Sequence, residues 1–155
     1  MSAVTSSAPA WPSDPQALAE RVAQAMWSRD QAAQALGMRL DAIGPGHARL
    51  SMAVRPDMLN GHGICHGGLI FTLADTAFAY ACNSSNHNTV ASACQIDFLA
   101  PGQSGDTLSA EAVEQTLAGR TGIYDIRVCA SNGQLLALFR GKSHRIAGHV
   151  TDLAA

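Results

Sequence analysis

The sequence of 155 residues predicts an α+β fold in which an antiparallel sheet wraps around one long, apolar helix. Residues 69–83 are apolar at nearly every position, which is typical of a helix buried on most of its faces. Long alternating runs precede and follow this segment, and Asn132-Gly133 between the last two runs is a strong signal for an antiparallel hairpin. Antiparallel strands with one apolar helix to cover favour a curved sheet around that helix. With 47% hydrophobic residues, the chain can form the core of a single domain.

The N-terminal part of the chain predicts a tail followed by a helix. Residues 1–13 are rich in Ser, Ala and Pro, and such a composition buries too little apolar surface to become ordered. A helix is predicted over 15–27, because Ser13 or Asp14 can accept a hydrogen bond at its start. Pro15 suits the first turn of that helix, and apolar residues recur along it at helical spacing.

A second helical segment and two strands are expected before the central helix. Asp30 can cap a short helix that ends at Gly37. The residues then alternate over 38–43 and over 47–54, which predicts two strands. Gly44-Pro45-Gly46 lies between them and indicates a tight turn.

Four further strands are predicted after the central helix. A polar break over 83–88 indicates a loop, Pro101-Gly102 closes the first strand, and the Asn132-Gly133 turn joins the last two. The predicted strands cover 89–98, 106–117, 123–130 and 134–146. We therefore place one domain over 14–147, with a C-terminal tail over 148–155.

A glycine-rich loop over 60–68 runs directly into the central helix. The start of a helix presents backbone N–H groups and a positive dipole end, so we predict that Gly67 holds a developing negative charge. Asp75 is the only charged residue of the helix, and a carboxylate among apolar side chains must be paired, exposed in a cleft or kept for chemistry. Gly67 and Asp75 lie roughly 12 Å apart along a helix, whereas one reaction allows about 6 Å. If both serve one reaction, Asp75 must come from a second copy across a two-fold axis.

The segment over 59–83, with Asn60, His66-Gly67-Gly68 and Asp75, resembles the hot-dog-fold acyl-CoA thioesterases of the PaaI type in phenylacetate degradation. The resemblance continues through 98–102 and 119–125 to the end of the last strand. It implies hydrolysis of phenylacetyl-CoA or hydroxyphenylacetyl-CoA thioesters. It also implies active sites made by two subunits, so we expect a homodimer as the minimal unit and a homotetramer in solution.

Roles for the candidate residues follow from their chemistry and from the resemblance. The Gly67 N–H polarises the thioester carbonyl. By resemblance Asp75 is the essential acid, either as nucleophile or as general base for a water. Asn60 orients the water or the thioester, or serves only in an Asn-Gly turn, and His66 braces the loop or touches the thioester. The residues that we assign to substrate binding are Gly68, Thr76 and the cations Arg120, Lys142 and Arg145, which are candidates for the coenzyme A phosphates.

The composition excludes several kinds of partner. A net charge of −2 and a pI near 6.3 give no basic field for nucleic acid or an anionic membrane. No apolar stretch is long enough to span a membrane. The four cysteines lack the spacing of a secreted framework and the N-terminus lacks a signal-peptide pattern, so we expect a cytoplasmic protein. The acyl-CoA substrate is the expected small-molecule partner, with no cofactor.

Alternatives remain for the chemistry. A hot-dog enoyl-CoA hydratase resembles an Asp-x4-His pair in the loop before the helix, but Gly61 stands where that acid would be. A non-catalytic module that binds acyl-CoA would bind without releasing thiol. Cys65 next to His66 suggests a cysteine nucleophile, yet adjacent side chains point apart and no separate histidine is placed to activate the thiol. A zinc site is disfavoured, because no common ligand spacing is matched by His62, Cys65, His66 and His87.

Overall fold

A computed structural model describes residues 11–152. The helices are α1 (Pro15–Trp27), α2 (Gln31–Ala35), the short 3-10 helix η1 (Pro56–Met58) and α3 (Gly67–Asn83). The strands are β1 (Arg39–Gly44), β2 (His47–Ala53), β3 (His87–Phe98), β4 (Thr107–Ala118), β5 (Thr121–Cys129) and β6 (Leu135–His149). Within these described residues no helix is long and apolar enough to cross a membrane.

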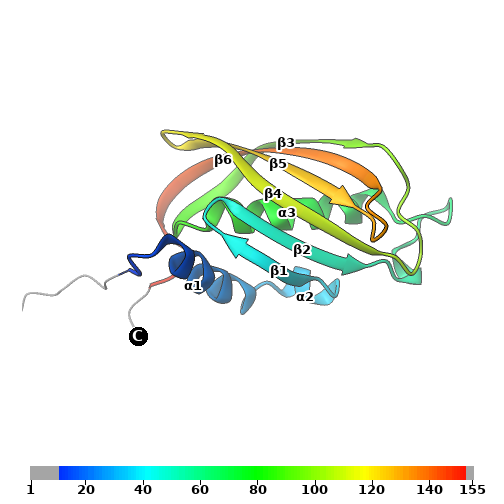
Figure 1. The fold of residues 1–155 in the computed structure, drawn as a ribbon, viewed down its shortest axis with the longest axis horizontal. Coiled ribbons are helices and arrows are strands. Elements are labelled where there is room, and N and C mark those ends of the chain that lie inside the picture. Colours follow the sequence, from blue (N-terminus) through cyan, green and yellow to red (C-terminus); the bar gives the residue numbers. More distant parts are fainter. Residues whose placement is uncertain (1–10, 153–155) are drawn as a thin grey trace, which may run out of the picture.

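The strands form one antiparallel sheet in the order β1-β2-β4-β5-β6-β3. The sheet curves around α3, which contacts every strand of it (Figure 1). The predicted wrapped sheet and its N-terminal helical segment are therefore confirmed. Because α3 lies between β2 and β3 in the sequence, the chain crosses from one side of the sheet to the other edge.

Helix starts follow the predicted caps. The Asp14 carboxylate accepts a hydrogen bond from the N–H of Ala17 and caps α1. Of the two predicted caps, Ser13 and Asp14, the structure therefore selects Asp14. The Asp30 carboxylate caps α2 in the same way through the N–H of Ala33. Each cap satisfies a backbone donor that the helix itself cannot.

The core lies between α3 and the inner face of the sheet. Phe78 of α3 packs against Tyr124 of β5 and Phe139 of β6. Burial of each such side chain contributes about 1.5–3 kcal/mol. Gly141 of β6 allows this packing, because a Cβ there would lie 2.7 Å from the Phe78 ring.

β6 extends beyond its predicted end at residue 146 and crosses the predicted domain boundary after residue 147. Its last residue, His149, pairs with His87 at the start of β3, and the two imidazole centroids lie 5.9 Å apart. Trp11 packs edge-on against both rings, so residue 11 of the predicted tail belongs to the folded part. Residues 1–10 and 153–155, which hold the rest of both predicted tails, lie outside the described residues.

The two edges of the sheet differ in length and in cover (Figure 1). β1 is short, its pairing is interrupted by a bulge, and α1 lies against it. The Gln16 side-chain amide of α1 donates a hydrogen bond to the Ile43 carbonyl of β1 at 2.8 Å. β3 has 12 residues with Asp97 as its only carboxylate, and among residues 11–152 no strand pairs with its outer side. Val90 and Phe98 of β3 are 46% and 54% exposed.

Candidate active site

The loop before α3 is shaped by Asn60. Its side-chain Oδ1 accepts hydrogen bonds from the N–H groups of His62 at 2.9 Å and Ile64 at 3.4 Å. The Asn60 N–H also donates to the Ile64 carbonyl at 2.8 Å, so this residue closes a tight turn. The oxygen is therefore committed to the loop. Only the side-chain N–H groups of Asn60, which lines a cleft described below, are available as donors.

His66 caps α3 and leaves one particular N–H group available. Its Nδ1 accepts a hydrogen bond from the N–H of Gly68 at 2.9 Å, which fixes the tautomer with the proton on Nε2. A Cβ on Gly68 would lie 3.1 Å from that Nδ1, so glycine gives the cap its room. The Gly68 N–H is thus occupied, although we assigned Gly68 to substrate binding. This cap supports the bracing role predicted for His66, which, like the predicted contact with the thioester, stays a prediction.

The Gly67 N–H is the donor that remains. Among residues 11–152 it has no hydrogen-bond acceptor, and it lies at the first position of α3. Both the positive end of the helix dipole and the unsatisfied N–H favour an oxygen that gains negative charge there. A Cβ on Gly67 would lie 3.1 Å from Cζ and 3.2 Å from Cε1 of Phe98, so this aromatic ring borders the donor.

A cleft of about 370 Å³ opens beside the Gly67 donor. Its walls are mainly apolar and come from the loop before α3, the first turns of α3 and the segment after β3. The lining residues are Asn60, Ile64, Cys65, Gly67, Ile70, Phe98, Leu99, Ala100 and Pro101. Sequence reasoning reached the segment 98–102 only through a resemblance, because its contact with Gly67 depends on how β3 pairs with β6. An apolar cleft with few polar groups is typical of a small-molecule site.

Asp75 lies on the open stripe of α3. At 3.6 residues per turn, Gly68, Thr72, Asp75 and Ala79 fall on one side of the helix, and none of them is fully buried. Among residues 11–152 the Asp75 carboxylate has no hydrogen-bond or ion-pair partner. Burial raises the pKa of Asp75 above its ordinary value. Burial and then the Asp75 charge raise the pKa of the Cys94 thiol, so the stripe borders β3.

Thr76, which we assigned to substrate binding, adjoins Asp75. Its hydroxyl donates to the Thr72 carbonyl at 2.7 Å, and the Thr72 hydroxyl donates to the Gly68 carbonyl at 2.8 Å. Their protons are therefore committed to the helix backbone, while the hydroxyl oxygens can still accept. Thr72 was missed by sequence reasoning, although its spacing of three residues from Asp75 places it on the same side of a helix.

The two candidate groups of one chain lie far apart. Gly67 and Asp75 both belong to α3, and eight residues of helix separate them by about 12 Å. A carbonyl held by Gly67 is therefore beyond the reach of the carboxylate on the same helix. The distance that the sequence predicted follows directly from the observed helix bounds.

The three candidate cations do not gather at one place. Arg120 lies in the turn between β4 and β5, and its carbonyl accepts a hydrogen bond from the Arg145 N–H. The Arg145 guanidinium donates to the Ser85 hydroxyl at 3.3 Å, just beyond the C-terminal end of α3. Lys142 belongs to the exposed set of alternate residues in β6, opposite to the face of the buried Ser143. Lys142 and Arg145 therefore point to opposite faces of the sheet.

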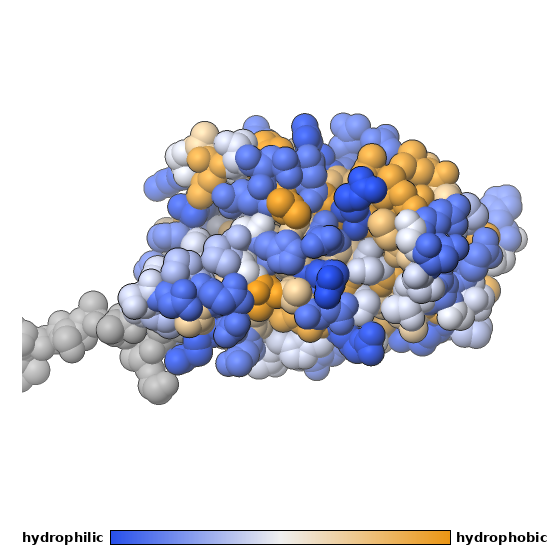
Figure 2. Space-filling model, viewed as in Figure 1, coloured by the Kyte–Doolittle hydropathy of each residue, from blue (hydrophilic) through white to orange (hydrophobic). Residues whose placement is uncertain are grey.

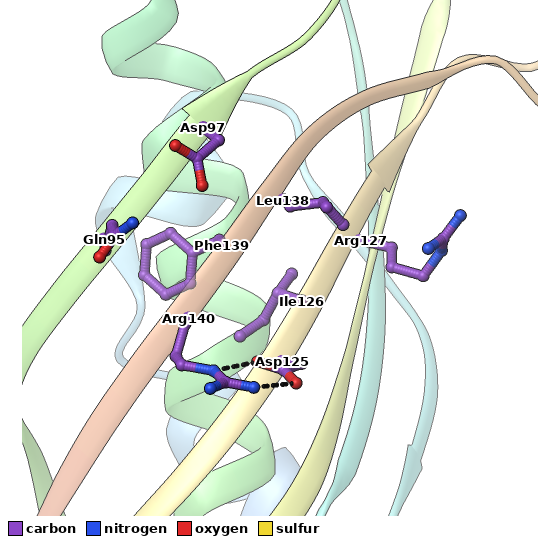
Figure 3. A pocket seen from close by; sticks show the side chains of 8 residues that line it. All are labelled: Gln95, Asp97, Asp125, Ile126, Arg127, Leu138, Phe139 and Arg140. Carbon is purple, nitrogen blue, oxygen red and sulfur yellow. Dashed lines mark hydrogen bonds and ion pairs between the residues drawn. The ribbon is translucent and has the colours of Figure 1, made fainter.

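A second hollow, of about 540 Å³, lies on the outer face of the sheet (Figure 3). Asp125 of β5 and Arg140 of β6 form a two-pronged ion pair there, with both N–O distances at 2.7 Å. The partner Arg140 lowers the pKa of Asp125. In this hollow the charges of Asp125 and Arg140 neutralise each other, and the Gly67 donor lies on the other face of the sheet. We therefore place the active site at the cleft beside Gly67.

The structure also bears on the alternatives. Cys65 is buried, and burial raises the pKa of its thiol, which disfavours the reactive thiolate. His87 lies at the opposite end of α3 from His66 and packs against His149. Over the described residues 11–152, no three metal-binding side chains come together.

Comparison with known proteins places these features in context. Residues 62–137 match the Thioesterase superfamily. The chain is 53% identical over 132 residues to the acyl-coenzyme A thioesterase PaaI of Escherichia coli K12, covering 85% of this chain and 94% of that protein. The solved structure of E. coli PaaI, from the phenylacetic acid degradation operon, superposes with a TM-score of 0.84 at 52% identity and covers 85% of this chain and 96% of that one. A Streptococcus mutans protein bound to acetyl CoA is 25% identical, with a TM-score of 0.70 over 72% of this chain and 90% of that one.

Proposed function

This chain belongs to the thioesterase superfamily as a hot-dog-fold acyl-CoA thioesterase of the PaaI type, and we propose that it hydrolyses phenylacetyl-CoA and hydroxyphenylacetyl-CoA thioesters. The products are the free acid and coenzyme A. The observation that carries the proposal is a pair of groups on one helix, the Gly67 N–H and the Asp75 carboxylate, neither of which has a partner within residues 11–152. The cytoplasm, where acyl-CoA esters are used, is the proposed location.

The Gly67 N–H is the proposed oxyanion donor. As a nucleophile adds to the thioester carbon, the carbonyl oxygen gains negative charge next to the helix start. The Asn60 side-chain N–H groups point a second donor at the same cleft. Loss of one such donor typically costs about 10²- to 10³-fold in rate.

Asp75 is the proposed acid of the partner subunit. Ionised, it either attacks the thioester carbon to give a mixed anhydride, which water then hydrolyses, or takes a proton from the attacking water. The thiolate of coenzyme A leaves in both cases. Partial burial raises the pKa of Asp75 and makes the carboxylate more basic, which suits either role.

The minimal unit that we propose is a homodimer joined at the uncovered side of β3. A long strand edge with few charges is a template for another strand, and the open stripe of α3 lies beside it. Antiparallel α3 helices across a two-fold axis would bring Asp75 of each subunit to Gly67 of the other. We further propose, from the resemblance to PaaI, that two dimers form a tetramer.

For the coenzyme A phosphates, the structure favours Arg120 and Arg145 over Lys142. Both arginines lie near the C-terminal end of α3, beyond Asp75 as seen from Gly67 of the same chain. A thioester bound at Asp75 can extend its pantetheine arm toward that end. Lys142 faces the other side of the sheet and is set aside.

Thiol release and subunit complementation test the proposal together. Wild-type protein should release thiol from phenylacetyl-CoA, and Asp75→Asn should abolish release while binding the substrate. Gly67→Pro removes the N–H donor at a helix position that accepts proline. A mixture of the two inactive variants, denatured and refolded together, should recover about a quarter of wild-type activity, because half of random dimers hold one intact site.

The matched control is Asp41→Asn, which removes an exposed carboxylate of β1, away from the proposed contact, and should keep full activity. Substrate binding by the wild type with no thiol release would support a binding module and contradict hydrolysis. Thiol release by the wild type without recovery in the mixture would contradict the shared site alone.

A further inference from the structure

We infer that Phe98 selects the acyl group, favouring a flat aryl group over a linear alkyl chain; this inference rests on the proposed thioester hydrolysis. Phe98 is the last residue of β3 and lines the cleft beside Gly67. Its ring is the side chain nearest to the position of a Gly67 Cβ, with three ring carbons within 3.6 Å. A carbonyl oxygen at hydrogen-bond distance from the Gly67 N–H therefore places its acyl substituent against this ring.

Phe98 differs from the other phenylalanines of the chain. Phe71, Phe78 and Phe139 pack against one another or against Tyr124 in the core. Among residues 11–152 Phe98 pairs with no aromatic ring, and it is 54% exposed. A half-exposed aromatic ring without an aromatic partner is available to a ligand, which would recover the contacts that the core rings already have.

The wall that carries Phe98 is held in place. The N–H groups of Leu99 and Ala100 both donate to the Leu136 carbonyl, at 2.8 and 3.2 Å. The Cys65 N–H donates to the Gly102 carbonyl at 2.8 Å, which ties this wall to the loop before α3. The backbone that carries Phe98 is therefore tied both to β6 and to the loop that leads to Gly67, which holds the base of this side chain beside the donor.

The size and surroundings of the cleft fit an aryl-acetyl group. A cavity of about 150 Å³ accommodates benzene, and the cleft of about 370 Å³ exceeds that enough to admit a ring with its methylene and thioester. Figure 2 shows apolar surface gathered at the end of the molecule where β3 ends and β6 begins. Leu99, next to Phe98, is 56% exposed and lines the same cleft.

Ring geometry makes the preference specific. Aromatic pairs at offset or edge-to-face geometry gain attraction beyond the apolar area that they bury, and an alkyl chain gains only the burial. Replacement of Phe98 by Leu keeps apolar area but removes this ring attraction. The effect should therefore fall on aryl substrates and not on alkyl ones.

The test compares kcat/KM for phenylacetyl-CoA and octanoyl-CoA, whose acyl groups have equal numbers of carbon atoms. Phe98→Leu should lower the phenylacetyl-CoA value about three- to tenfold and change the octanoyl-CoA value by less than about twofold. Phe98→Tyr keeps the ring and should keep the preference. Leu138→Ala, which removes an exposed apolar side chain from the outer face of the sheet, should change neither value.

Size-exclusion chromatography of each variant separates selectivity from assembly. Equal losses for both substrates in Phe98→Leu, or no loss for either, would overturn the inference while leaving the proposed hydrolysis intact. Absence of thiol release from either substrate by the wild type would overturn the proposed function and this inference with it. A preserved preference in Phe98→Leu that is lost in Phe98→Tyr would also overturn it.

Discussion

The two edge strands of the sheet differ in how well they are protected from pairing with another strand. β1 is bulged, carries Arg39 and Asp41, and is tied to α1 by the hydrogen bond from Gln16 to Ile43. β3 is twice as long, carries a single carboxylate, and leaves Val90 half exposed. Edge strands invite pairing unless they are short, charged, bulged or covered. β1 is thus protected within the chain, whereas β3 is the edge at which we propose that a second copy of the chain binds.

The unprotected edge lies on the side of the molecule that carries both candidate groups, Asp75 and Gly67. The open stripe of α3 with Asp75 borders β3, and the cleft with Gly67 lies at the end of β3. β1 has neither feature. In the dimer that we propose, assembly and catalysis use the same surface, so changes at the outer side of β3 should affect both and matched changes elsewhere neither.

The largest expected effect comes from a charge placed on the β3 edge. Val90→Asp puts a carboxylate at the proposed contact, and an unpaired charge cannot be buried there without a high cost. We expect monomers and a loss of about 10²-fold or more in thioesterase rate, because each site loses its partner's acid. Sedimentation velocity and thiol release measure the two effects.

Val113→Asp is the control for this change, since Val113 is 43% exposed, close to the 46% of Val90, but lies on β4, which β5 and β6 separate from β3. It should leave a dimer with full activity. A dimeric, active Val90→Asp protein would show that subunits join elsewhere.

The next effect is the pH dependence of activity, with Asp75 as the titrating group and Asp41 of β1 as the control. Asp75 must be ionised to act, and burial raises its pKa above the 3.8 of an ordinary Asp. On acidification, kcat/KM should therefore begin to fall at a pH above that value, and by about tenfold per pH unit below the raised pKa. Asp41→Asn, on β1, should leave this profile unchanged. A profile that stays flat down to the range of an exposed carboxylate would argue against Asp75 as the titrating group.

A smaller effect is expected at the protected edge. Gln16→Ala removes the hydrogen bond to the Ile43 carbonyl, and such a bond contributes about 0.5–1.5 kcal/mol to stability. The melting temperature should fall by about 2–5 °C, with no change in oligomeric state or activity. Differential scanning calorimetry checks the first part. A loss of dimer in this variant would place part of the subunit contact at β1.

The smallest effect is a gain in stability where function is lost. Burial raises the folded-state pKa of Asp75, so the group favours folding below its unfolded value near 3.8 and loses this contribution as pH rises through the folded value. Asp75→Asn removes the ionisation and should melt above the wild type at neutral pH. This difference should shrink toward pH 4. A lower melting temperature at neutral pH would indicate that the carboxylate has a stabilising partner.

Local features of the fold could be predicted from the sequence because they depend on neighbouring residues. The caps at Asp14 and Asp30, the start of α3 at Gly67 and the hairpin at Asn132-Gly133 all belong to this kind. Asp75, the only charged residue of α3, could also be identified from the local sequence pattern. Each depends on contacts within a few residues, which a sequence displays directly.

Features that depend on strand pairing could not be predicted. Phe98 meets Gly67, 31 positions earlier in the sequence, only because β3 joins the sheet beside β6. The same pairing extends β6 to His149 and turns the face that carries Arg145, rather than the face with Lys142, toward α3. Alternation along a strand shows that two residues share a face, but not which face is turned to the helix.

Gly141 limits the substitutions that the sheet can accept. The ring of Phe78 occupies the space into which any larger residue at 141 would grow, with ring carbons 2.7 Å from the Cβ position. The packing of α3 against the curved sheet therefore depends on the absence of a side chain at residue 141. A side chain at residue 141 would be tolerated only with a smaller residue at position 78. The two positions can therefore vary only together, and their combined size sets the spacing between α3 and β6.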